Sequence, residues 1–60
     1  MADKLVNFFD EAKKIGGMKG QMRLSLITKM SIVKAKEAED SPENIQKFEE
    51  AITEIKKEFN

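Results

Sequence analysis

Residues 40–59, DSPENIQKFEEAITEIKKEF, carry the clearest folding signal in the chain. Ser41 is suited to cap a helix, Pro42 fits a first helical turn that needs no amide donor, and Glu43 favours the positive end of the helix dipole. Apolar residues then recur in strict steps of three and four at positions 45, 48, 52, 55 and 59. This spacing predicts a helix over about 42–59 with a narrow apolar seam.

The N-terminal part of the chain predicts another helix, over about 3–15. Asp3 favours its start, and five apolar residues lie on one face: Leu5, Phe8, Phe9, Ala12 and Ile15. Gly16 and Gly17 then predict its end, because glycine adopts the left-handed conformation of a helix C-cap without strain. One long helix kinked at the glycines is the alternative, since the methionines at positions 18 and 22 continue the apolar spacing. We favour the break.

The middle segment predicts a single helix over about 18–38 that is apolar on two nearly opposite sides. One side holds Met18, Met22, Leu26, Met30 and Val33. The other side holds Leu24, Ile27, Ala35 and Ala38, with Ser31 among them. A helix with two apolar sides must be covered on both.

Two arrangements would cover these sides. The other two helices of the chain could take one side each, which gives a monomeric three-helix bundle. Alternatively, one side meets a second chain, and we favour this arrangement because so short a chain gains much from pairing its remaining apolar surface. The small side chains near the end of the second side would allow close approach, so we expect the interface at Leu24, Ile27, Ser31, Ala35 and Ala38.

The predicted fold is therefore all-α: a small three-helix bundle, or a helical hairpin with an added N-terminal helix. The helices over 18–38 and 42–59 are expected to form the antiparallel hairpin, with the first helix folded back across it. We expect the whole chain, residues 1–60, to form one domain that assembles as a homo-oligomeric helical bundle.

Composition narrows the chemistry further. The chain has 60 residues with no Cys and no His, which excludes disulfides and ordinary zinc sites. We expect no cofactor and no bound metal. The absence of Cys is compatible with the cytoplasm, and no apolar run reaches the length of a transmembrane segment. We therefore expect a cytoplasmic protein.

The net charge of zero hides a strong segregation of charges. Seven basic and no acidic residues lie between positions 13 and 36, whereas eight acids and three lysines follow from position 37 onward. We expect the basic and acidic helices to pair. The alternative is a nucleic-acid or anionic-membrane binder that uses Lys19, Arg23, Lys29 and Lys34. A single Arg and the lack of Tyr and Trp argue against nucleic acid.

No residue pattern predicts catalysis. Glu50, Glu54 and Glu58 are spaced one helical turn apart but lie outside the apolar seam, where carboxylates stay solvated and make poor general acids. No His is present to activate a Ser or Thr nucleophile. The glycines at 16, 17 and 20 lack the Gly-Lys-Ser/Thr ending of a phosphate loop. We expect a non-enzymatic protein–protein interaction or oligomerisation module that binds itself and, in addition, another protein.

Overall fold

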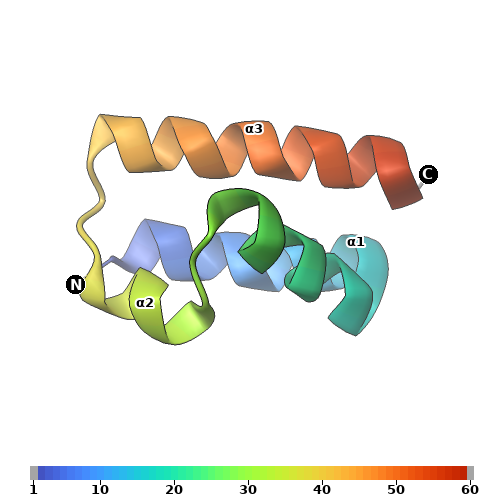
Figure 1. Ribbon diagram of the computed structural model, residues 1–60, viewed down its shortest axis with the longest axis horizontal. Coiled ribbons are helices and arrows are strands. Elements are labelled where there is room, and N and C mark those ends of the chain that lie inside the picture. Colours follow the sequence, from blue (N-terminus) through green and yellow to red (C-terminus); the bar gives the residue numbers. More distant parts are fainter. Residues whose placement is uncertain (1, 60) are drawn as a thin grey trace.

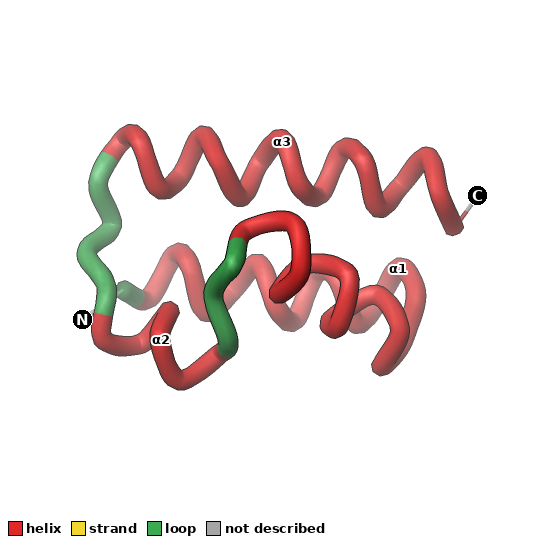
Figure 2. Tube along the Cα trace, in the orientation of Figure 1, coloured by secondary structure: helices red, strands yellow, loops and turns green. Residues whose placement is uncertain are grey.

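The computed structural model describes residues 2–59. Over that range the chain forms three α-helices: α1 (Asp3–Thr28), α2 (Ile32–Glu37) and α3 (Pro42–Phe59). No β-strand occurs between residues 2 and 59, and the helices pack into one bundle (Figures 1 and 2). The all-α fold class expected from the sequence is confirmed, and α3 has the bounds that its cap and apolar spacing predict.

Helix α1 reverses direction at Gly17. The backbone there has φ 63° and ψ −143°, a combination that is essentially restricted to glycine. Residues 3–16 and 18–28 are thus two helical halves that lie antiparallel (Figure 1). The break predicted from the glycine pair therefore occurs at Gly17. Gly17 is the single non-helical residue between the two halves, so both halves keep the label α1.

The two halves of α1 approach each other closely at Gly20. A Cβ atom on Gly20 would lie 2.3 Å from the carbonyl oxygen of Ala12, which is far inside van der Waals contact. The next residue, Gln21, donates a 3.2 Å hydrogen bond from its side-chain amide to the carbonyl of Phe9, which lies one turn before Ala12. The absence of a side chain at Gly20 therefore allows the backbones of the two halves to touch.

The predicted continuous helix over 18–38 is wrong, because the chain leaves the helical conformation after Thr28. Lys29 adopts the left-handed conformation, with φ 59° and ψ 28°. Ser31 then caps α2, its hydroxyl accepting a 3.3 Å hydrogen bond from the backbone amide of Lys34. The physical reason is that a serine side chain can replace the missing helical partner at an N-cap, so the segment bends and restarts in a new direction.

The loop after α2 ties the start of the first helix to the start of the last. The Ser41 hydroxyl accepts from the amide of Asn44 at 3.2 Å and caps α3 as predicted. Its neighbour Asp40 accepts from the backbone amides of Lys4 and Leu5, each at 3.3 Å. Asp40 thereby satisfies amides at the N-terminus of α1, a position where α1 has no side-chain cap of its own.

The core lies between the two halves of α1 and α3. Phe48 of α3 is fully buried and contacts both Phe8 and Phe9, with ring centroids 5.6 Å and 6.0 Å apart. The other buried apolar side chains come from every element: Ala2, Leu5, Ala12, Leu24, Ala35, Ala51, Ile52 and Ile55. Each long helical segment thus buries one face against the other two, which gives a three-helix bundle within one chain.

Candidate contact surface

Four of the five residues predicted to meet a second chain instead face the interior of this one. Leu24 and Ala35 have no exposed surface, and Ile27 and Ala38 pack partly against the core. Ser31 is exposed but serves as the cap of α2. The placement of the interface on these five residues is therefore corrected: the chain itself covers the four apolar ones, because the turn at Gly17 and the bend after Thr28 direct them towards the core.

The opposite side of the same segment is the exposed apolar surface. Met18, Met22 and Leu26 are spaced one turn apart and are 74%, 69% and 68% exposed. They lie on the side of residues 18–28 that faces away from buried Gly20, Leu24 and Thr28. We call these three residues the outer ridge. Exposed methionine and leucine side chains in a row are typical of surfaces that contact another protein.

A groove of about 480 Å³ runs beside the outer ridge, between the second half of α1 and the end of α3. Met22, Leu26 and Phe59 form its apolar lining. Lys19 and Arg23 stand on the α1 side and Glu58 on the α3 side. We call this the α1–α3 groove; its apolar lining and charged edges could hold an apolar side chain of a partner and contact charged groups around it.

One ion pair, between Arg23 and Glu58, joins the two edges of the groove. A guanidinium nitrogen of Arg23 donates to a carboxylate oxygen of Glu58 at 2.5 Å, and both side chains are about 40% exposed. The hydrogen bond and the charge of Glu58 raise the pKa of Arg23 above its usual value. Between residues 2 and 59 this is the ion pair formed by the basic α1 segment and α3, so the expected charge pairing is present at a single position.

The four residues of the predicted basic strip do not share one helix face. Lys19 and Arg23 lie one turn apart on α1, whereas Lys29 is in the left-handed turn that ends α1. Lys34 belongs to α2, beyond the bend. The structure therefore brings two of the four residues together and separates the other two from them.

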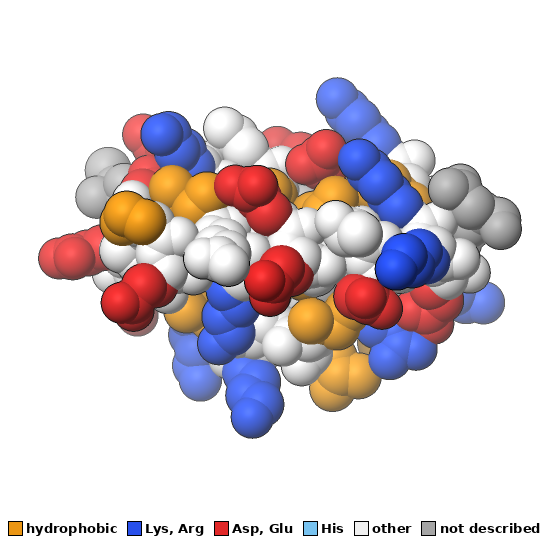
Figure 3. All heavy atoms as spheres, turned by 90° about the horizontal axis from the view of Figure 1, so that it is seen from above, with side chains coloured by type: hydrophobic (Ala, Val, Ile, Leu, Met, Phe, Trp, Pro, Cys, Tyr) orange, Lys and Arg blue, Asp and Glu red, His pale blue; other side chains and the backbone are white. Residues whose placement is uncertain are grey.

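The glutamates of α3 remain on the surface. Glu50, Glu54 and Glu58 are exposed, and acidic side chains gather along the face that α3 presents (Figure 3). In the part of the chain that is described, no group of three or more acidic residues is arranged to hold a metal ion. Helices within residues 2–59 include none that is both long and apolar enough to cross a bilayer.

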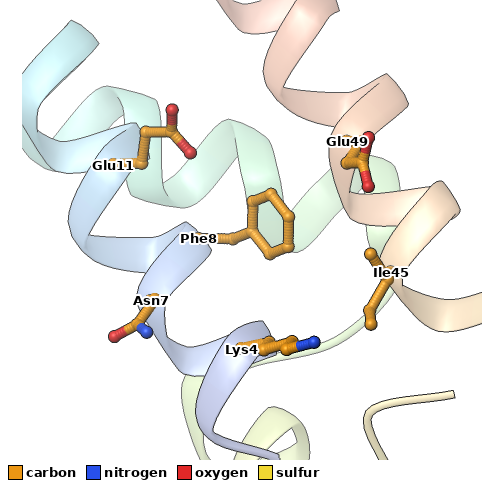
Figure 4. A pocket seen from close by; sticks show the side chains of 6 residues that line it. All are labelled: Lys4, Asn7, Phe8, Glu11, Ile45 and Glu49. Carbon is orange, nitrogen blue, oxygen red and sulfur yellow. The ribbon is translucent and has the colours of Figure 1, made fainter. Parts of the chain in front are cut away.

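A second hollow, of about 400 Å³, lies between the first half of α1 and the start of α3. Figure 4 shows Phe8 and Ile45 pointing from facing helices into the space, with Lys4, Glu11 and Glu49 around it. Phe8 also packs on Phe48, so this hollow is a depression over the core. Its rim holds no combination of nucleophile, base and orienting group that acid–base or nucleophilic catalysis needs.

Comparison with protein-family models, with characterised proteins and with solved structures finds no match to this chain.

The hydrophobic periodicity of the sequence predicted part of this surface. It placed Met18, Met22 and Leu26 on one side of a helix, but it left open which of the two apolar sides the chain would cover. Phe59 completes the groove, and only the packing of α3 beside α1 brings it there. Ser31 was a sequence signal for the bend, because serine is suited to an N-cap. The apolar spacing on two sides of the segment, which continued past Ser31, favoured an unbroken helix instead.

Proposed function

We propose that this protein is a non-enzymatic protein–protein interaction module that acts through the outer ridge and the α1–α3 groove. The observation that carries the proposal is the exposure of three large apolar side chains in a row, at 74%, 69% and 68%, on a helical segment whose opposite face is buried. Exposing such a row to water is unfavourable, and covering it with a partner recovers that free energy.

The groove supports recognition of a helix. An amphipathic helix that binds in a groove places apolar side chains at steps of three and four residues into apolar hollows. The ridge residues Met18, Met22 and Leu26 have this same one-turn spacing, so two helices laid side by side could interdigitate their side chains. Methionine suits this role because its flexible side chain adapts to the partner's shape.

Titration of isotope-labelled protein with a designed amphipathic helical peptide, carrying leucines at its a and d positions, tests the proposal by NMR. We expect the amide shifts to concentrate at residues 18–26 and at the end of α3. Full burial of a leucine contributes about 1.5–3 kcal/mol, so Leu26→Lys is expected to weaken binding by about tenfold or more.

Val33→Lys is the matched control, because Val33 is also exposed, at 60%, but belongs to α2. It should leave the affinity nearly unchanged. Shifts spread over α2 and the outer face of α3, or equal affinities for the Leu26→Lys and wild-type proteins, would contradict the proposal.

A further inference from the structure

The two edges of the α1–α3 groove carry opposite charges. Lys19 and Arg23 belong to the α1 edge, and residues 18–28 contain no acid. Glu58 belongs to the α3 edge, and Glu54, one turn earlier, lines the neighbouring hollow together with Lys57 and Ile27. The two segments run antiparallel (Figure 1), so the groove has Lys19 and Arg23 on one side, apolar side chains in the middle and Glu58 on the other side.

We propose that the occupant of this groove is a second copy of the chain, related to the first by a two-fold axis that runs along the groove. The inference rests on the proposed function and names its partner. A two-fold axis makes an interface in which the same patch meets itself. With the axis along the groove, the α1 edge of each copy lies over the α3 edge of the other.

Charge complementarity selects this axis. Arg23 of one copy then faces Glu58 of the second copy, and Glu58 faces Arg23 of the second copy. Because Arg23 and Glu58 already pair within each chain, the four charges alternate in sign around the axis. A network of alternating charges is more favourable than isolated surface pairs, which contribute little one by one.

The other two-fold axis that could stack the grooves runs across them and is disfavoured. It would lay the α1 edge of one copy on the α1 edge of the other, so that the basic side chains Lys19 and Arg23 of the two copies would face each other. The α3 edges, each with the acid Glu58, would likewise face each other. Like charges placed opposite each other destabilise an interface, so the axis along the groove is favoured over the axis across it.

The apolar part of the interface comes from Met22, Leu26 and Phe59 of both copies. The described protein has 4278 Å² of accessible surface, and a standard stable interface buries about 800 Å² per partner. That would be nearly a fifth of the surface, more than one groove and its edges supply. Interfaces below the standard size are typical of weak, transient complexes, so the dimer is expected to be weak.

Three proteins test the inference by light scattering over a concentration series and by native mass spectrometry of mixtures. The first is wild type. The second, the single-edge variant, carries Lys19→Glu and Arg23→Glu. The third, the exchanged variant, adds Glu54→Lys and Glu58→Lys, so that the two edges swap charge while an ion pair remains possible at positions 23 and 58.

We expect wild type and the exchanged variant to dimerise with similar affinities, and the single-edge variant to dimerise at least about tenfold more weakly. A mixture of isotope-labelled wild type with the exchanged variant should contain fewer heterodimers than random pairing gives, because like edges then meet. Circular dichroism establishes whether each variant is folded. If the single-edge variant is unfolded, the mixture of wild type with the exchanged variant still tests the inference.

Preferential formation of heterodimers in that mixture would overturn the inference, because it indicates the axis across the groove. An unchanged affinity for the single-edge variant would overturn it as well. If wild type stays monomeric throughout while the amphipathic peptide still binds at residues 18–26, self-pairing is refuted and the proposed function stands. If the peptide does not bind there and wild type stays monomeric, both fail.

Discussion

Replacing Gly20 with alanine tests the close contact between the two halves of α1. An alanine Cβ would lie 2.3 Å from the carbonyl oxygen of Ala12 and 3.2 Å from its carbonyl carbon, whereas ordinary contact begins at 3.4 Å. Both clashing atoms belong to backbone, so no side chain can rotate away. The two halves must therefore separate by about 1 Å, which weakens every dispersion contact across the seam by a quarter to a half.

The expected cost follows from two opposing effects. Overpacking of this kind costs about 1–3 kcal/mol, and the better helix propensity of alanine offsets up to about 1 kcal/mol. Because no side chain can relieve the clash, the upper part of the overpacking range applies, and we predict a net loss of about 1–2 kcal/mol in the free energy of unfolding. Each kcal/mol lowers the melting temperature of a domain of this size by roughly 4–8 °C. Urea unfolding followed by circular dichroism measures it.

Gly16→Ala is the control for this prediction. The nearest atoms to its new Cβ are those of the Phe59 ring, at 3.0–3.1 Å, and this half-buried ring at the end of α3 can move aside. Its unfolding free energy should change by less than about 1 kcal/mol. A Gly20→Ala protein as stable as wild type, or more stable than Gly16→Ala, would refute the close backbone approach.

Three further predictions concern single positions, each read out by urea unfolding. Asp40→Ala removes the cap that satisfies two amides of α1 and should cost about 1 kcal/mol; Asp40→Asn keeps an acceptor, and equal losses in both variants would argue against a capping role. Phe48→Ala opens the centre of the core and should cost about 3–5 kcal/mol, enough to unfold a chain this small, so retention of a cooperative transition near that of wild type would contradict the packing. Gly17→Ala places a side chain in open space at φ +63° and should cost about 1–3 kcal/mol through backbone strain alone; an unchanged stability would mean that the turn has another conformation.

The parts of the fold that depend on local signals could be predicted from the sequence. Ser41 and Pro42 define the start of α3, and its apolar spacing of three and four residues defines the buried face that holds Phe48 and Ile55. The glycine pair marks the turn of α1, where Gly17 supplies a conformation that other residues avoid. In each case the nearest neighbours along the chain determine the structure.

The features that depend on tertiary contact could not be predicted in the same way. Asp40 caps a helix that begins more than thirty residues earlier, and nothing in the local sequence pairs it with Lys4. Hydrophobic periodicity placed Leu24 and Met22 on opposite sides of a helix, but it cannot say which side the rest of the chain covers. That choice follows from the direction of the turn at Gly17 and from the bend after Thr28.

The exposed apolar surface differs from the predicted interface because of these tertiary contacts. A continuous helix to residue 38 would align Ala35 with Leu24 along one exposed stripe, whereas the restart at Ser31 turns Ala35 into the core. The predicted basic strip is interrupted at the same bend, because Lys29 lies in the turn that ends α1 and Lys34 lies in α2. The unrecognised N-cap at Ser31 therefore accounts for the position of Ala35 and for the separation of Lys34 from Lys19 and Arg23, whereas Leu24 is buried in the part of α1 that follows the turn at Gly17.

The central claim is that the side of residues 18–28 opposite Leu24 is exposed in the monomer and covered by a second copy. Broadening of methionine methyl resonances by a soluble paramagnetic agent, measured across a protein concentration series, tests both halves of it, with half-buried Met30 as internal reference. We predict strong broadening at Met18 and Met22 in dilute solution, and protection of Met22 that grows with concentration while Met30 stays constant. Weak broadening of Met22 in dilute solution, or equal broadening at every concentration, would contradict the account.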